Sequence, residues 1–94
     1  MFYERRMSSL AAVAEEAVTM DADAGIRMVG KYGGRMCYAF VSRFGSRYTV
    51  MVYERKGRRG GVGKRIASEE LGSLEELKSF LRKVTSRKVE AFAY

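Results

Sequence analysis

Two runs rich in aromatic and β-branched residues flank Gly45-Ser46 within residues 36–55, which is typical of two strands joined by a tight turn. A second pair, Gly33-Gly34, separates this region from the run Ile26–Tyr32. Glycine tolerates the positive φ angle of two-residue hairpin turns, so each pair predicts a tight turn between antiparallel strands. We expect the first strand over Ile26–Tyr32 and a two-stranded hairpin over Met36–Arg55.

The two turns predict the pairing register, and both assign the residues to the same two faces. Ile26 should lie opposite Val41 and Val41 opposite Val50, whereas Tyr38 should lie opposite both Val29 and Tyr53. One face is then mainly small and aliphatic, with the members Ile26, Met28, Gly30, Cys37, Ala39, Val41, Val50 and Val52, together with Glu54 and, near the turn, Arg43 and Tyr48. The other face is aromatic and basic, with the members Arg27, Val29, Lys31, Met36, Tyr38, Phe40, Ser42, Phe44, Arg47, Thr49, Met51, Tyr53 and Arg55.

Apolar residues at three- and four-residue spacing predict one helix before these strands in the sequence and one after them. The first helix is expected over residues 3–19, with a stripe made of Met7, Leu10, Val13, Ala14, Ala17 and Val18. The second is expected from Leu74 to about Thr85, with Leu74, Leu77, Leu81 and Val84 as its stripe. Ser73 and Glu76 have the spacing of a capping box, in which each side chain bonds a backbone N–H of the first turn.

The remaining segments are less regular. Lys56–Gly61 predicts a basic, glycine-rich loop, and Val62–Ala67 a weaker fourth strand with Ile66 inward and Arg65 on the basic side. Lys88–Tyr94 is either a short strand or an extended tail, docked on the domain or on a second subunit. The predicted fold is one α+β domain over residues 1–94, of order α-β-β-β-β-α. Both helices pack on one face of a four-stranded antiparallel meander.

Composition excludes several kinds of chemistry. The chain has no His and one Cys, so imidazole metal sites, His-dependent nucleophiles and thiolate zinc clusters are ruled out, and we expect no cofactor or metal. No apolar run is long enough to span a membrane, and the N-terminus lacks the apolar core of a signal peptide, so a cytoplasmic location is expected.

The net charge of +7 is concentrated in the predicted sheet. Residues 24–68 hold eleven Lys and Arg residues against one Glu, whereas residues 1–23 hold two basic and five acidic residues. Solubility alone accounts for a net charge but not for this segregation, which favours a polyanion such as nucleic acid as partner.

The aromatic and basic face suits unpaired bases, because aromatic rings stack on bases while Arg and Lys hold the backbone. We therefore predict non-catalytic binding of single-stranded DNA, or of RNA, with low sequence specificity and no catalytic residue. The candidate nucleic-acid-binding residues are Arg27, Lys31, Tyr38, Phe40, Phe44, Arg47, Tyr53, Arg55, Arg58 and Arg59. Two alternatives are a small toxin-type ribonuclease using Tyr53, Glu54 and Arg55, and a homo-oligomeric interaction module that covers the aromatic face.

The chain lacks Asn and Gln, and Arg outnumbers Lys twelve to six, which favours a protein selected at high temperature. With the basic Gly57–Gly61 loop and the Tyr and Phe residues of the meander, the chain resembles the ThermoDBP-related single-stranded DNA-binding proteins of thermophilic archaea. This resemblance is architectural and covers most of the chain. It implies a sheet-and-helix domain with a hydrophobic cleft edged by basic residues, acting as a dimer or higher homo-oligomer. Founding members of that family look longer, with a C-terminal zipper helix that this chain does not match.

Overall fold

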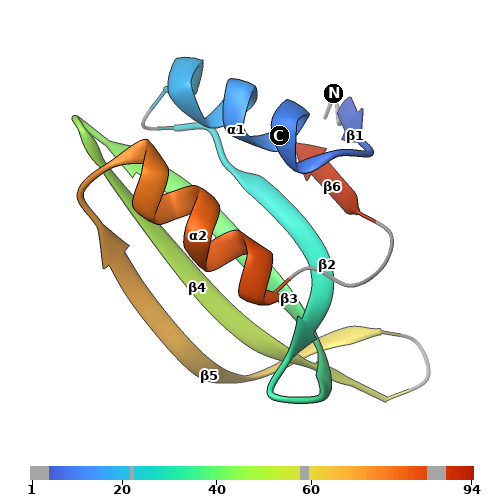
Figure 1. Ribbon diagram of the computed structural model, residues 1–94. Coiled ribbons are helices and arrows are strands. Elements are labelled where there is room, and N and C mark those ends of the chain that lie inside the picture. The colour runs from blue at the N-terminus through green and yellow to red at the C-terminus, as the bar shows by residue number, and fades with distance from the viewer. Residues whose placement is uncertain (1–4, 22, 58–59, 85–88) are drawn as a thin grey trace.

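The structure is a computed structural model that describes residues 5–21, 23–57, 60–84 and 89–94. Among these residues, two helices and six strands follow one another along the chain (Figure 1). They are β1 (Arg5–Met7), α1 (Leu10–Thr19), β2 (Ile26–Tyr32), β3 (Arg35–Phe44), β4 (Arg47–Lys56), β5 (Gly61–Leu71), α2 (Leu74–Val84) and β6 (Glu90–Ala93). The fold is α+β, with two helices packed on one antiparallel sheet.

Strands β2, β3 and β4 form the predicted meander in the predicted register. Ile26 lies opposite Val41 and Val41 opposite Val50, while Tyr38 lies opposite both Val29 and Tyr53. The alternation of side chains then divides these strands into the two faces expected from the sequence. Every small or aliphatic member of the aliphatic face is buried, and so is Tyr48, whereas Arg43 and Glu54 are partly exposed.

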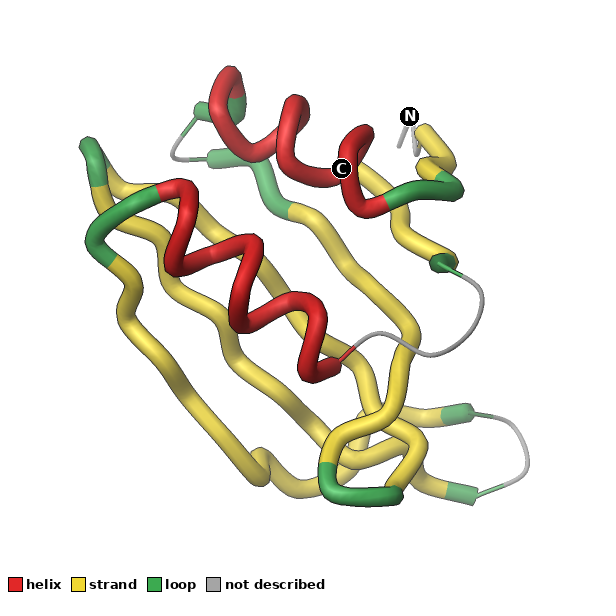
Figure 2. The backbone as a smooth tube through the Cα atoms, viewed as in Figure 1, coloured by secondary structure: helices red, strands yellow, loops and turns green. Residues whose placement is uncertain are grey.

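The predicted number of strands is wrong, because the sheet has six strands in the order β1-β6-β2-β3-β4-β5. Strand β6 inserts between β1 and β2, so Phe92 lies opposite Arg6 on one side and Arg27 on the other (Figure 2). Of the two alternatives for Lys88–Tyr94, Glu90–Ala93 is therefore a strand, and Tyr94 extends the pairing through two backbone hydrogen bonds with Gly25.

The first helix also begins later than predicted. Residues 5–7 pair with β6 as a strand, and Ser9 caps the helix by accepting a hydrogen bond from the backbone N–H of Ala12 at 3.1 Å. A serine at this position ends the preceding strand and satisfies one of the unpaired N–H groups of the first turn. Met7 is buried as predicted, but it enters the core from β1 rather than from the helix.

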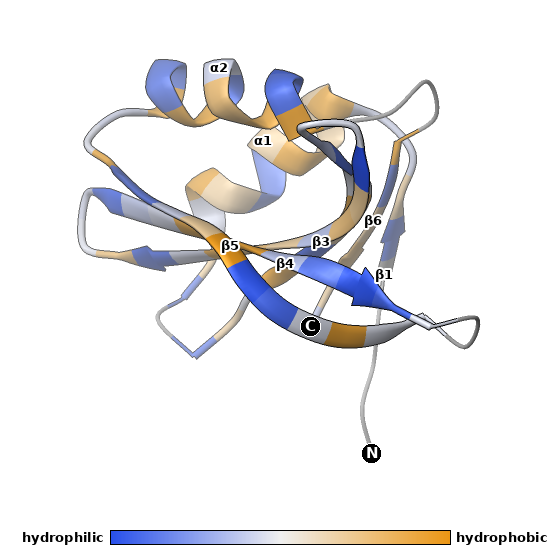
Figure 3. Ribbon diagram, turned by 90° about the horizontal axis from the view of Figure 1, so that it is seen from below, coloured by the Kyte–Doolittle hydropathy of each residue, from blue (hydrophilic) through white to orange (hydrophobic). Residues whose placement is uncertain are grey.

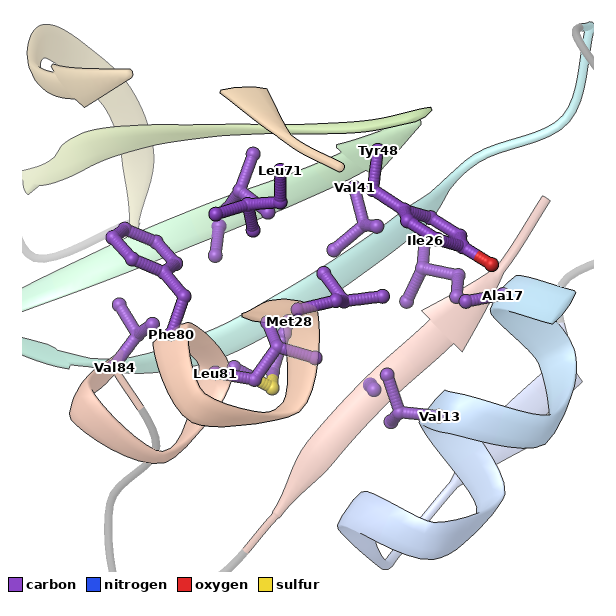
Figure 4. Packing of buried hydrophobic residues seen from close by; sticks show 14 of the residues in the cluster. Val13, Ala17, Ile26, Met28, Val41, Tyr48, Leu71, Phe80, Leu81 and Val84 are labelled. Carbon is purple, nitrogen blue, oxygen red and sulfur yellow. The ribbon is translucent and has the colours of Figure 1, made fainter. Parts of the chain in front are cut away.

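Both helices cover the aliphatic face and form the core with it (Figures 1 and 4). Val13 and Ala17 of α1 and Leu77, Leu81 and Val84 of α2 are all at most 1% exposed. Phe80, which lies outside the predicted stripe, is also buried. Val18 was expected in the first stripe but is 43% exposed. Among the described residues, no helix is both long and apolar enough to cross a lipid bilayer.

The second helix starts at the predicted cap. The backbone N–H of Glu76 donates to the Ser73 hydroxyl at 3.2 Å, and the Glu76 carboxylate accepts from the N–H of Gly72 at 3.1 Å. The carboxylate thus reaches one residue further back than in the usual reciprocal box.

Strand β5 forms one edge of the sheet and is longer than predicted, because it continues through Ser68, Glu69 and Glu70. Ile66 packs against the core, and Arg65 is exposed opposite Tyr53, as expected. Charged residues are common on edge strands because they discourage pairing with other chains.

Candidate nucleic-acid interface

The face of the sheet opposite the helices carries the aromatic and basic residues that the sequence assigns to it. Figure 3 shows α1 and α2 on one side of the sheet and neither helix on the other. We call this second side the open face. Its members on β2, β3 and β4 are Arg27, Val29, Lys31, Met36, Tyr38, Phe40, Ser42, Phe44, Arg47, Thr49, Met51, Tyr53 and Arg55.

The far end of the β4–β5 hairpin bends over the open face. Two register shifts interrupt the pairing of β5 with β4, one between Val52 and Tyr53 and one between Tyr53 and Arg55. Irregularities of this kind increase the local bend and twist of a ribbon. The bend brings Gly60 to Tyr38, whose hydroxyl donates a hydrogen bond to the Gly60 carbonyl.

The hairpin end and the open face form two walls of a groove with a volume of about 380 Å³. Small-molecule sites in proteins typically enclose roughly 300–1,000 Å³, so this groove has the size of a site for one small group. Its lining is mostly apolar and aromatic, with one guanidinium and one hydroxyl. The lining residues are Arg27, Val29, Tyr38, Phe40, Gly60 and Val62.

The close approach at the hairpin end depends on glycine. An ideal Cβ built on Gly60 would lie 2.7 Å from the Tyr38 hydroxyl oxygen and 2.9 Å from Nε of Arg55. The φ angle of Gly60 is 71°, a region that other residues rarely adopt. Gly60 therefore lets the backbone touch the open face and keeps Arg55 beside the groove.

The aromatic residues do not form one continuous stack. Phe40 and Tyr53 pack edge-to-face with ring centroids 5.6 Å apart, a geometry that the ring quadrupoles favour. Phe44 is 81% exposed and lies four residues further along β3, about 13 Å from Phe40 for an extended strand. The open face therefore offers two separate stacking positions, the Phe40–Tyr53 pair beside the groove and Phe44 at the β3–β4 turn.

Three of the predicted cations lie at the groove end of the open face. Arg27 lines the groove, and its guanidinium carbon lies 5.0 Å from the ring centroid of Phe92, a cation–π distance. Arg55 is exposed opposite Val62, which also lines the groove, and Lys31 is exposed four residues from Arg27 along β2, about 13 Å away in an extended strand. Phosphates of a strand whose base enters the groove would lie within reach of this group.

The other predicted cations differ in their surroundings. Arg47 lies at the β3–β4 turn, where its Nη1 donates to Oε1 of Glu70 at 2.9 Å. Both side chains are 62% exposed, so their attraction is screened by solvent. Arg58 and Arg59, which the sequence also nominates, lie outside the described residues.

Sequence reasoning missed three residues of the site. Phe92 reaches the open face because β6 inserts beside β2, and Gly60 and Val62 reach it because the hairpin bends. The apolar character of the last residues predicts docking but not its location. The glycines of the basic loop were the available signal for a close backbone approach, although they do not specify its target.

The three residues proposed for a ribonuclease do not converge. Glu54 alternates with Tyr53 and Arg55 along β4 and lies opposite the buried Cys37. Its carboxylate lies 3.7 Å from the guanidinium of Arg35. Glu54 therefore sits on the other side of the strand from the groove, and the described part of the open face has no general base among the three.

The buried thiol and the acidic residues are two further kinds of group that could carry chemistry. Burial raises the pKa of the Cys37 thiol, which favours the unreactive protonated form. Within the described ranges, no cluster of three His, Cys, Asp or Glu residues is placed to hold a metal ion. What the open face offers is stacking surface, hydrogen bonds and positive charge.

Comparison with protein families, curated proteins and solved structures finds no match for this chain.

Proposed function

We propose that the protein binds single-stranded nucleic acid, DNA or RNA, on the open face, with low sequence specificity and without catalysis. The observation that carries this proposal is the groove, in which the aromatic rings of Tyr38 and Phe40 meet Arg27 on a face that neither helix covers. Bases would stack on Phe40, Tyr53 and Phe44. Phosphates would lie along Arg27, Lys31 and Arg55.

Unpaired bases fit this surface better than a duplex does. Aromatic side chains stack on bases only where the bases are free of their neighbours and partners. A duplex presents phosphates and groove edges, for which half-buried rings such as Phe40 and Tyr53 are of little use. The rings therefore favour a single strand, and the resemblance to ThermoDBP-related proteins supports the same proposal.

Charge supports a salt-dependent contact with the backbone. If Arg27, Lys31 and Arg55 each neutralise one phosphate, log K should fall with log salt with a slope of about −2. Affinity would then drop roughly 20-fold between about 50 and 200 mM salt. Glu70 reduces the expected contribution of Arg47, because the two side chains are already paired.

Fluorescence anisotropy tests the proposal directly. Labelled oligonucleotides of about 16 nucleotides, single-stranded DNA, single-stranded RNA and duplex DNA, are titrated at both salt concentrations. We expect single strands to bind at least about fivefold more tightly than the duplex, since one stacked base is worth roughly 1–3 kcal/mol. Equal affinity for the duplex, or no binding of either single strand, would overturn the proposal.

The same samples separate the two rival functions. Gel analysis of the RNA after incubation detects cleavage, which a ribonuclease would produce and the proposed binder would not. Light scattering without nucleic acid measures oligomeric state. A stable oligomer that leaves oligonucleotides unbound would assign the open face, including the exposed Phe44 and Met36, to contact between protein chains.

A further inference from the structure

We propose that the groove beneath the β4–β5 hairpin end is a binding site for one nucleotide. When a single strand is bound, one of its own nucleotides would occupy this site. This inference rests on the proposed function and adds to it a defined base pocket. The base would enter between the floor formed by Val29 and Phe40 and the wall formed by Val62, with its phosphate beside Arg55.

The geometry of the groove selects a flat, apolar group. The groove has walls on two sides, and its volume of about 380 Å³ is large enough for one nucleotide. Val62 is 55% exposed, so its side chain is free to contact a ligand in the groove. A base inserted here would cover Val62 and contact the ring of Phe40.

The charges around the groove favour an anionic substituent on that flat group. Arg27 lines the groove, and the Arg55 guanidinium lies beside Gly60 at its edge. Among the described residues of the open face, two acidic side chains lie within ion-pair distance of a basic one, and one of them, Glu90, lies opposite Val29 of the groove. Glu70 pairs with Arg47, and Glu90 lies 3.9 Å from Arg6. A nucleotide, which joins an apolar ring to a phosphate, matches this distribution.

The hairpin end is held in place before any ligand binds. The Tyr38 hydroxyl donates to the Gly60 carbonyl, and the N–H of Gly60 donates to the carbonyl of Gly57 at 3.3 Å. A preformed site loses little freedom on binding, so even a lone nucleotide should bind measurably. The groove therefore differs from the rest of the open face, which offers stacking on one side only.

Two glycines of the same turn provide a matched pair of variants. Gly60→Ala puts a methyl group against the ends of the Tyr38 and Arg55 side chains, which must move away, so the hydrogen bond from Tyr38 to Gly60 should be lost. Gly57→Ala introduces a methyl group at a similar φ of 70°, but its Cβ meets nothing within 4 Å. Both variants strain the turn backbone, and only Gly60→Ala should disrupt the groove. Val62→Ser removes the apolar wall without backbone strain and serves as a second test.

The experiment titrates isotope-labelled protein with thymidine monophosphate and follows backbone amide resonances by NMR, while anisotropy measures binding of a single-stranded oligonucleotide. We expect saturable shifts at residues that line the groove, and smaller shifts at Phe44. Gly60→Ala and Val62→Ser should each weaken nucleotide binding about fivefold or more, because each disturbs one wall of the groove while the ring of Phe40 stays in place. Gly57→Ala should bind like the parent protein.

The outcomes separate this inference from the proposed function. If the oligonucleotide binds but the nucleotide shifts no groove residue, or if Gly57→Ala and Gly60→Ala behave alike, the base pocket is wrong and single-strand binding stands. If neither ligand binds the parent protein, both proposals fail. Saturable groove shifts that Gly60→Ala and Val62→Ser abolish and Gly57→Ala preserves would support the pocket.

Discussion

Phe40 and Val41 are adjacent on β3 but lie on opposite faces of the sheet, and together they test which face binds the ligand. Phe40 lines the groove and packs against Tyr53, whereas Val41 is 1% exposed in the core. Changing each to Ala removes an apolar side chain from one face and leaves the other face intact. We expect Phe40→Ala to weaken binding and Val41→Ala to weaken the fold.

The two effects have different expected sizes. Phe40→Ala removes one stacking surface, worth roughly 1–3 kcal/mol, so the Kd for a single strand should rise about 5- to 140-fold. Its stability should fall by at least about 1 kcal/mol, because the edge-to-face pair contributes roughly 0.5–1.5 kcal/mol beyond the burial of the half-buried ring. Val41→Ala removes two buried carbons at about 0.8 kcal/mol each and leaves a cavity, a loss of about 2 kcal/mol.

Two assays read these effects separately. Thermal unfolding should show a drop in Tm of about 8–16 °C for Val41→Ala, since each kcal/mol corresponds to roughly 4–8 °C in a domain of this size. Anisotropy, performed well below both Tm values, measures the Kd of the folded protein. An unchanged Kd for folded Phe40→Ala, or an equal rise for both variants, would refute the assignment of binding to the open face.

Three further changes test other parts of the structure. Glu70→Gln removes the carboxylate that pairs with Arg47, which frees Arg47 to contact a phosphate. Anisotropy should then show tighter single-strand binding and a slope of log K against log salt that is steeper by about 0.7, whereas a weaker complex would contradict this. Ser73→Ala removes the cap that the Glu76 N–H uses and should lower the unfolding free energy by about 1 kcal/mol in denaturant titration, with Kd unchanged. Burial raises the pKa of Cys37 in the folded state, so the folded protein keeps a thiol proton that the unfolded chain loses above about pH 8.5. The unfolding free energy of the parent protein, measured relative to that of Cys37→Ala, should therefore fall as pH rises beyond that value. A rise of this free-energy difference with pH would contradict the burial of the thiol.

The sequence predicts the centre of the sheet well because its signals there are local. The turns at Gly33-Gly34 and Gly45-Ser46 and the alternation around them specify the register of β2, β3 and β4, and the structure has that register. Successive side chains on a strand point to opposite sides of the sheet, so once the residues of one face are assigned, those of the other face are assigned too. The composition of the open face was therefore predictable before its shape was known.

The edges of the sheet were not predictable for the opposite reason. Strands β1 and β6 are three and four residues long and pair across almost the whole length of the chain. Such short segments carry too little periodicity to distinguish a strand from a helix turn or a tail. The predicted fourth strand ends at Ala67 because residues 68–70 are polar, yet β5 continues through them. Polar and charged residues are common on edge strands, so their presence does not end the strand.

The groove arises from a bend that no local pattern encodes. Register shifts between β4 and β5 turn the hairpin end toward Tyr38, and Gly60 permits the contact. The sequence nominates Tyr38 and Arg55 individually, but it does not predict that Gly60 brings them together with Val62. The sequence therefore predicts which types of residue line the open face, but not the tertiary shape that forms the groove.

Photochemical crosslinking measures the central claim most directly, because it marks the residues that touch the bases. Single-stranded DNA containing 5-iododeoxyuridine is irradiated with the intact protein, and mass spectrometry locates the adducts, with duplex DNA of the same sequence as control. Binding on the open face predicts adducts on the strands at Tyr38, Phe40 and Tyr53, with Phe44 as a further position. Adducts confined to α1 and α2, or equal yields with the duplex, would contradict it.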